Sequence, residues 1–519
     1  MKKSGFSELI RQSEATLCFI FCLMMAVVFP FFLSNGYMKG GTDKGVLYIY
    51  ISGAFCIFGV FLYVLYIIGR VKDNGLSTSF AKPSLPDIFM LVYFLVINLS
   101  FYFSYNRRFA LTGEGGWYQG YLTSIFLVLS YFFISQFLDK YKLIVIFLCI
   151  SAGIEFLLGT LNRFDIYPVE LEGASTGFIS TLGNINWFCG FWSVFFALAA
   201  GIFYMTENRI VMIFTGILTG LGAIIGAVQG SDSALIVYVA VILAIFFKAV
   251  KSDKEHRLRS MITASVIVGS MSLMHVFLKI TGLKTNYDSV ATSVLAYSPI
   301  SIVLFVIAVA IGVVTYLLSE EATEILFKVL KNISLLLLIS GVVFYLFLLI
   351  VRSVNPEAFA FIPNESPFIP GYEWGNGRGY TWVAGIKVYF DGGILQKLIG
   401  WGPDSFAYGV YRGDSSVAAF IIDKFGDARL TNAHNEWITV LCNYGLVGFI
   451  GFVGAQTGKA KQFLSRKGTI PFACGVALVS YMSHNFFSFA QPVNIPFIFI
   501  IMGIGNAAMQ NKDASKVDF

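Results

Sequence analysis

The sequence predicts an all-α, polytopic membrane protein with about 14 transmembrane helices (12–14) and one large extracytoplasmic loop that carries short surface helices. Three observations support this fold class. Of the 519 residues, 57% are hydrophobic and only 13% are charged, whereas soluble domains carry about 25% charged residues. Apolar stretches recur along the chain, close to the length of about 20 helical residues that crosses a bilayer core. One long polar segment interrupts them in the last third of the chain.

In order along the chain, the apolar stretches predict helices that close their backbone hydrogen bonds internally, as hydrocarbon requires. They cover approximately residues 15–33, 46–68, 87–104, 121–138, 143–160, 187–204, 210–228, 233–248, 260–278, 295–318, 333–351, 436–454, 470–488 and 492–508. The first stretch is longer than the apolar region of a signal peptide, and no small-residue cleavage site follows it. We therefore expect it to be a retained membrane anchor.

The distribution of Lys and Arg predicts the orientation of these helices, because positively charged connections are retained on the cytoplasmic side. With both termini inside, the cytoplasmic segments hold 22 of the 36 Lys and Arg residues, and the short outer loops hold seven. We therefore expect a multi-pass protein with cytoplasmic termini and with the long polar segment on the extracytoplasmic side.

The chain is expected to form one membrane domain with one loop subdomain. Its parts are transmembrane helices over 1–351, the extracytoplasmic loop over 352–433, and the last three helices with a short cytoplasmic tail over 434–519. Within the loop, apolar residues over 382–398 recur near helical spacing and are interrupted by Gly392 and Gly393. This pattern predicts two short amphipathic helices on the membrane surface. A third helix is predicted over 416–424.

Two residues near the loop are candidates for chemistry. His434 lies where the loop returns to the membrane, and an imidazole there can stay neutral near pH 7 and accept a proton from a hydroxyl. Alternatively, it simply anchors a helix end. Arg378 begins the first predicted surface helix, where its guanidinium and the helix N-terminal amides could hold a diphosphate. Alternatively, it contacts lipid phosphates, the commoner role of a lone arginine near a membrane surface.

Two further outer loops combine aromatic and amide side chains. The connection between the third and fourth stretches contains Trp117 and Gln119, and the connection between the fifth and sixth contains Asn184 and Asn186. Aromatic faces stack on sugar rings and amides bond hydroxyls, so both loops suit sugar binding. They suit an interfacial aromatic belt equally well.

Inside the membrane, Glu155 interrupts the fifth stretch, and Asp232 lies in the turn before the eighth. Buried acids are usually paired or functional, although a solvated cap of the eighth helix is the simpler interpretation of Asp232. No Walker loop, paired-aspartate motif or His/Cys cluster occurs, so no nucleotide, cofactor or metal is expected. The seven cysteines lie in or beside apolar stretches, and a net charge of +6 does not indicate nucleic acid binding.

Six short motifs occur in a characteristic order. They are Gly116-Trp-Tyr-Gln-Gly-Tyr121, Thr181-Leu-Gly-Asn-Ile-Asn186, Ser231-x-Ser-Ala234, Arg378-x3-Trp382, Gly400-x-Gly-Pro403 and His434-Asn435. Together, on a matching hydropathy profile from about residue 85 to 508, they resemble the O-antigen ligase and O-antigen polymerase superfamily. Each motif alone is weak, and their order makes the resemblance specific.

The resemblance implies a metal-independent glycosyltransferase of the type C class in the bacterial plasma (inner) membrane. Such enzymes work at the outer face and move a glycan from undecaprenyl diphosphate to a hydroxyl of an acceptor glycan or glycolipid, as ligases or polymerases of surface polysaccharide. On this chain the resemblance implies that His434 activates or positions the acceptor and that Arg378 holds the leaving diphosphate. Trp382 and Asn435, within the same two motifs, are expected to bind substrate.

One position departs from the family pattern. Ligases of this group commonly have an arginine after the serine of the turn before the eighth helix, where this chain has Asp232. A second cation for the diphosphate would then come from Arg107, Arg108 or Arg163. Ligase and polymerase stay equally open, as do the sugar, the acceptor and the oligomeric state. The alternative function is a transporter or flippase of lipid-linked oligosaccharide, which the lack of repeated halves with broken helices disfavours.

Overall fold

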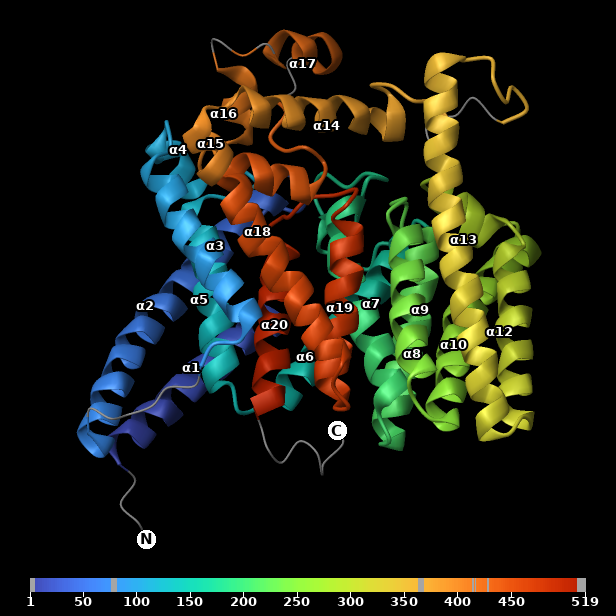
Figure 1. Ribbon diagram of the computed structural model, residues 1–519, viewed down its shortest axis with the longest axis horizontal. Coiled ribbons are helices and arrows are strands. Elements are labelled where there is room, and N and C mark those ends of the chain that lie inside the picture. Colours follow the sequence, from blue (N-terminus) through green and yellow to red (C-terminus); the bar gives the residue numbers. More distant parts are fainter. Residues whose placement is uncertain are drawn as a thin grey trace.

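The structure is a computed structural model that describes residues 5–75, 82–362, 368–412, 415, 417–426 and 429–510. Nearly all of its regular structure is helical, and Figure 1 shows upright helices side by side with a small helical layer across one end. Ten helices within the described residues are long and apolar enough to cross a membrane. The prediction of an all-α membrane protein is confirmed at this level.

Fourteen helices form the upright bundle. They are α1 (Phe6–Val27), α2 (Gly40–Asn74), α3 (Leu85–Tyr102), α5 (Tyr121–Phe137), α6 (Tyr141–Asn162), α7 (Ile185–Met205), α8 (Arg209–Val228), α9 (Ala234–Val250), α10 (Lys254–Thr281), α12 (Ile300–Leu317), α13 (Glu320–Val354), α18 (Glu436–Leu464), α19 (Thr469–His484) and α20 (Ile495–Gln510). Each overlaps one predicted apolar stretch, although α1 begins and ends earlier than the predicted 15–33 and α13 begins before the predicted 333–351. The number of membrane spans stays a prediction, because α5, α9, α19 and α20 are shorter than 18 residues.

Short elements connect the upright helices. They are α4 (Arg107–Thr112), the antiparallel pair β1 (Phe178–Ile179) and β2 (Gly183–Asn184), α11 (Val290–Thr292), the π-helical turn η1 (Ser293–Tyr297), α14 (Trp374–Asp391), α15 (Ile394–Ile399), α16 (Phe406–Tyr411) and α17 (Val417–Phe425). The three helices predicted for the long loop are present as α14, α15 and α17. The short helix α16 was not predicted.

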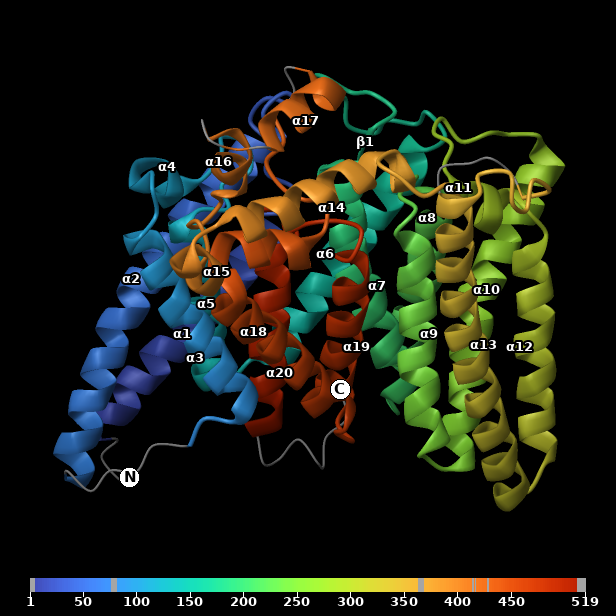
Figure 2. The same cartoon turned by 45° about the horizontal axis from the view of Figure 1, so that its top comes forward.

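Burial differs sharply between the centre and the edge of the bundle. Of the residues in the apolar 18-residue stretch of α7, 94% are buried inside the protein. Two of them, Trp192 and Phe196, stack with their ring centroids 5.0 Å apart. In the corresponding stretch of α13 only 6% of the residues are buried, and Leu336 and Leu337 are exposed. Figure 2 shows α12 and α13 at one edge. Such broad apolar exposure suits contact with lipid, because in water it would favour aggregation.

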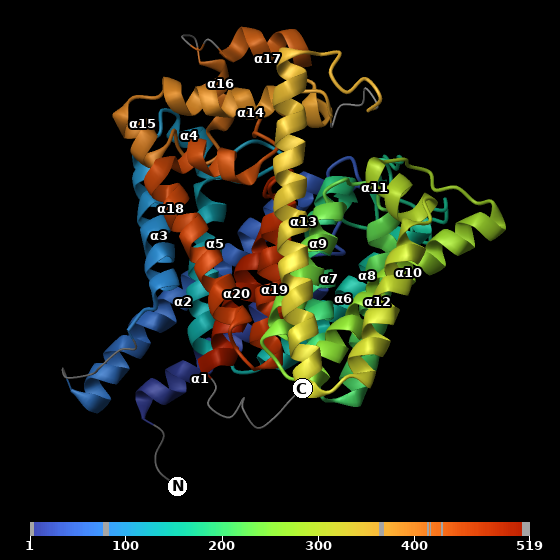
Figure 3. The same cartoon turned by 45° about the vertical axis from the view of Figure 1, so that its right-hand side comes forward.

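The helices of the long loop form a layer over the bundle. Figure 3 shows α14 lying across the ends of the upright helices, with α17 above it. A separate small core holds this layer together, in which Val388 of α14 packs with Phe406 of α16 and Ile421 of α17. Gly385 lets α14 approach α18, because a Cβ at this position would lie 2.4 Å from Ile438.

A kink in α18 joins the loop layer to the bundle. Gly445 breaks the helix with φ 64° and ψ −173°. Just before the break, the carbonyl of Cys442 accepts the N–H of Trp401 at 3.0 Å, and the carbonyl of Asn443 accepts that of Gly402 at 3.1 Å. The segment after α15 thus supplies hydrogen bonds where the broken helix does not, as an irregular backbone inside a membrane protein requires.

We expect Gly400→Ala to destabilise the protein. Gly400 has φ 82°, and a Cβ there would lie 2.1 Å from the carbonyl oxygen of Asn443, a backbone atom that cannot move aside cheaply. Backbone strain and overlap together should lower the free energy of unfolding by about 2 kcal/mol or more. Thermal unfolding of the purified protein in detergent, followed by intrinsic fluorescence, measures the change.

Gly341→Ala is the matched control for this substitution. Gly341 lies in α13, and an added Cβ would meet no atom within 4 Å. Alanine favours helix over glycine, so this variant should be at least as stable as the wild type. Equal unfolding temperatures for Gly400→Ala and Gly341→Ala would contradict the close approach of α15 to the kink.

Candidate functional site

The connection that follows α19 gathers the predicted site residues. In this segment, which we call the 485–490 turn, the carbonyl of Phe486 accepts a hydrogen bond from Asn435 Nδ2 at 3.0 Å. The carbonyl of Phe487 accepts bonds from Arg378. The residues of α14 and α18 that the sequence singled out therefore meet on one turn, although they are distant in the chain.

Arg378 donates hydrogen bonds to this turn through part of its guanidinium. Nε and Nη2 donate to the Phe487 carbonyl at 3.1 and 2.9 Å, and Nη1 donates to the Gly375 carbonyl at 2.7 Å. Of the five N–H groups of a guanidinium, two are left for a ligand. α14 is bounded at Trp374, but Gly375 and Gly377 have positive φ values of 62° and 82°, so the regular part of the helix begins at Arg378, as expected.

The charge of Arg378 is only partly compensated. Burial lowers the pKa of Arg378, and the carboxylate of Asp232 opposes this effect. Since arginine loses its proton only far above neutral pH, the guanidinium remains a half-buried cation.

His434 lies beside this cation in a constrained backbone conformation. Its φ is 50°, in the left-handed region, and its N–H donates to Asn432 Oδ1 at 2.9 Å. The imidazole lies 5.0 Å from the ring of Phe489, and it makes no hydrogen bond with other described residues. Burial, together with the positive charge of Arg378, lowers the pKa of His434 to about 4. The imidazole is therefore neutral near pH 7 and has a nitrogen free to accept a proton.

A small polar cavity of about 40 Å³ lies next to His434 and is lined by Asn432, Asp404 and Glu436. Such a volume holds water but not a sugar. Asp404 Oδ2 accepts the N–H of Glu114 at 2.7 Å, and Glu436 Oε2 accepts that of Ala490 at 2.6 Å. Burial raises the pKa of Asp404 to about 7, and the carboxylate of Glu114 adds to this rise. These two acids were not among the predicted site residues, although both stand next to motif residues.

A second histidine joins the site from α19. His484 is fully buried, its Nδ1 lies 2.9 Å from Ser233 Oγ, and its Nε2 has no partner. Ser231 Oγ lies 3.0 Å from Ser233 Oγ and donates to Asn186 Oδ1 at 2.9 Å. The serine pair was predicted only as a motif, and His484 was not among the predicted site residues. The repeated His-Asn pair at 434–435 and 484–485 was a usable signal.

The aromatic and amide residues predicted to bind substrate fall into two groups. Trp117 lies 5.3 Å from Phe489, and Gln119 lines the small cavity with it. Trp382 packs 5.9 Å from Phe487, and its buried indole N–H has no partner. These three side chains border the site.

The remaining amides are engaged in the fold. Asn435 Oδ1 caps α18 by accepting the N–H of Ile438 at 3.1 Å, and Asn184 Oδ1 caps α7 by accepting that of Asn186 at 2.9 Å. Both amides fix the local backbone at the motifs, and Asn435 also holds the 485–490 turn.

The three arginines considered as a second cation have two kinds of surroundings. Arg107 and Arg108 are exposed on α4, where Arg107 lies 5.0 Å above the ring of Tyr102. Arg163 is fully buried and donates to the carbonyls of Gln229 and Thr176 and to the side chain of Asn286. Burial lowers the pKa of Arg163 to about 10. In this arrangement Arg163 ties loops together.

The two acids discussed from the sequence also have defined roles in the structure. Asp232 does not cap the following helix, contrary to expectation, because its Oδ1 accepts the N–H of Ala291 at 3.0 Å and Ser233 is the cap residue. Glu155 is buried and accepts hydrogen bonds from the hydroxyl and N–H of Thr181 at 2.5 and 3.3 Å.

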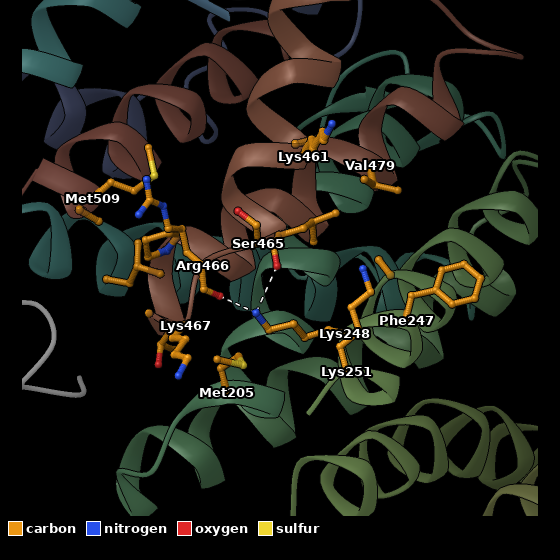
Figure 4. A pocket seen from close by; sticks show the side chains of 18 of the residues that line it. Met205, Phe247, Lys248, Lys251, Lys461, Ser465, Arg466, Lys467, Val479 and Met509 are labelled. Carbon is orange, nitrogen blue, oxygen red and sulfur yellow. Dashed lines mark hydrogen bonds between the residues drawn. The ribbon is translucent and has the colours of Figure 1, made fainter. Parts of the chain in front are cut away.

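An extended groove of about 2000 Å³ begins at the 485–490 turn, where Phe486, Phe487 and Trp437 line it. It continues along α9, α18 and α19 to the opposite end of the bundle. We call it the lateral groove, and Figure 4 shows residues of its far part. Its upper end thus lies directly under the carbonyl that Arg378 binds.

Within the described residues, no group of three or more His, Cys, Asp or Glu side chains is placed to hold a metal ion. Comparison of the sequence with known protein families and with curated proteins finds no match.

We expect Arg378→Gln to raise the pKa of His434, because it removes a nearby positive charge while burial continues to favour the neutral ring. The pH dependence of diethylpyrocarbonate modification, read at the peptide containing His434 by mass spectrometry, reports the fraction of neutral imidazole. Lys387→Gln, on the exposed face of the same helix, should leave the midpoint unchanged. A wild-type midpoint near 6.5 would contradict the assigned environment.

We expect Asp404→Asn to change how stability depends on pH. In the wild type the folded pKa of about 7 exceeds the ordinary value of 3.8, so the folded state binds more protons between these values. The protonated Asp404 therefore stabilises the folded state below about pH 4, and this stabilisation is lost as the pH rises through 7. The unfolding temperature of the variant minus that of the wild type should therefore increase from pH 4 to 7. Asp423→Asn, at an exposed site, should show no such gain.

Proposed function

We propose that the chain is a membrane glycosyltransferase of the O-antigen ligase and polymerase type, which moves a glycan from undecaprenyl diphosphate to an acceptor hydroxyl. The observation that carries this proposal is the meeting of a half-buried Arg378 and a neutral His434 on the 485–490 turn. The cation supplies what a leaving diphosphate needs, and the neutral imidazole supplies what an attacking hydroxyl needs.

In the proposed reaction, the acceptor oxygen forms a bond to the anomeric carbon of the donor glycan while the bond from that carbon to the diphosphate breaks. The hydroxyl proton passes to His434, and the lipid diphosphate leaves with the bonding electrons. Attack from the face opposite the leaving group inverts the anomeric centre. Binding of the anionic diphosphate at Arg378 would offset the charge that lowers the pKa of His434, so the imidazole becomes a better base when the donor is bound.

The lateral groove supports a lipid-linked donor. A diphosphate at Arg378 would lie above Phe487, and an isoprenoid chain attached to it would meet the apolar upper wall formed by Phe486, Val479 and Met482. The aromatic residues Trp117 and Trp382 border the same site and offer faces for sugar rings.

We expect His434→Ala and Arg378→Ala each to abolish activity while leaving folded protein. Loss of a general base costs about 10²- to 10⁴-fold in rate. Arg378→Lys keeps the charge but loses the planar fork, so it should restore little activity. Complementation of a deletion strain, with analysis of surface polysaccharide and of lipid-linked glycans, measures the effect. Lys387→Ala, exposed on the same helix, should complement fully.

The same deletion strain separates the possible functions. Single repeat units on undecaprenyl diphosphate at the outer face would identify a polymerase, and full-length polymer still attached to that lipid would identify a ligase. Accumulation at the cytoplasmic face would identify a transporter and would overturn the proposal. Full complementation by a folded His434→Ala or Arg378→Ala variant would remove that residue from the mechanism.

A further inference from the structure

The lateral groove has a second end with different chemistry. Away from the 485–490 turn, cationic side chains gather in its lining. They are Lys142, Lys248, Lys251, Lys461, Arg466 and Lys467. The acidic residues that line the groove are Glu207 and Asp253, and Asp253 already pairs with His256 at 2.8 Å. We call this end the basic mouth.

Lys248 organises the basic mouth. Its ammonium group donates to the backbone carbonyls of Leu464 at 3.2 Å and Arg466 at 2.6 Å, where α18 ends (Figure 4). The last carbonyls of a helix carry partial negative charge, so they attract the ammonium group. This contact fixes α9 against the end of α18 and satisfies the charge of Lys248 within the protein.

Four other cations of the mouth are not satisfied in this way. They are Lys251, Lys461, Arg466 and Lys467. Their exposed side chains form no ion pair or hydrogen bond with the rest of the described chain. Like charges repel, and an anion bound near them would lower this repulsion. Membrane insertion explains an excess of Lys and Arg on one side. It does not explain why cations from α9 and from the α18–α19 connection meet at the opening of one groove.

Apolar side chains continue directly from the basic mouth into the groove. Phe247 of α9, Leu464 of α18 and Ile470 of α19 line its lower part, and Val479 and Met482 lie further up. A ligand that fits must present an anionic group beside long apolar chains. A free phosphate would satisfy the cations but would leave the apolar walls uncovered.

We propose that the basic mouth and the lower lateral groove bind one anionic phospholipid from the membrane leaflet at that end of the bundle. The phosphate lies in the basic mouth, where the combined positive charge of Lys251, Lys461, Arg466 and Lys467 attracts it, and the acyl chains lie along α9 and α19. Clustered Lys and Arg residues in pockets between transmembrane helices are suited to anionic headgroups.

The test is lipid retention by the purified full-length protein. Protein exchanged into detergent with equal amounts of phosphatidylglycerol and phosphatidylcholine is examined by native mass spectrometry. We expect at least about fivefold more phosphatidylglycerol than phosphatidylcholine on the wild type. The combined change of Lys251, Lys461, Arg466 and Lys467 to Gln should reduce this ratio to about one, the value for lipid that is not selected by charge.

A matched control removes the same charge elsewhere at this end of the bundle. The combined change of Lys72, Lys82, Lys140 and Arg209 to Gln avoids the residues that line the groove, so the wild-type ratio should persist. A second variant, Ala244→Trp, keeps every charge and fills the lower groove where α9 lines it, and it should lower retention of phosphatidylglycerol. Thermal unfolding verifies that each variant is folded, and the wild-type lipid preference is measured independently of them.

Several outcomes would overturn this assignment. They are an equal retention of both lipids by the wild type, an equal loss of preference in the control, or full retention in Ala244→Trp. Displacement of phosphatidylglycerol by millimolar inorganic phosphate would indicate a site for a soluble anion. Lipid retention is measured without any glycan, so its failure would leave the proposed transferase function untouched.

Discussion

The bond between the Arg378 guanidinium and the carbonyl of Phe487 is the contact on which the proposed site depends. It ties the loop helix α14 to the 485–490 turn, and the same turn accepts a hydrogen bond from Asn435 at the start of α18. One backbone segment therefore positions a cation and an imidazole from distant parts of the chain. A guanidinium that donates to backbone carbonyls keeps its charge and its remaining N–H groups. Arg378 can therefore bind the 485–490 turn and still interact with an anion.

The second constraint is the backbone hydrogen bonding at the kink of α18. A transmembrane helix that breaks leaves carbonyls without partners, and in hydrocarbon this is costly. Here the segment after α15 approaches closely enough to donate to Cys442 and Asn443, which glycine at 400 and 445 makes possible. The kink and the loop layer thus stabilise each other, and the loop is held against the bundle at two places.

Cations have different surroundings at the two ends of the lateral groove. At the upper end, burial and a single guanidinium favour a neutral imidazole, which suits proton transfer. At the lower end, several exposed cations stand beside apolar walls, which suits an anionic headgroup with its chains. The groove between them is apolar, so both ends are suited to amphipathic ligands and differ in how deeply the charge is buried.

The sequence by itself determined the helical membrane fold, because apolar length and the spacing of side chains along a helix are local properties. Every predicted apolar stretch overlaps a helix, and three loop helices were predicted close to their observed places. Only the tertiary structure placed His484 with Ser233, tied down Arg163, left Arg107 exposed and turned Asp232 towards Ala291. These arrangements follow from contacts between segments remote in the chain, which no local pattern encodes.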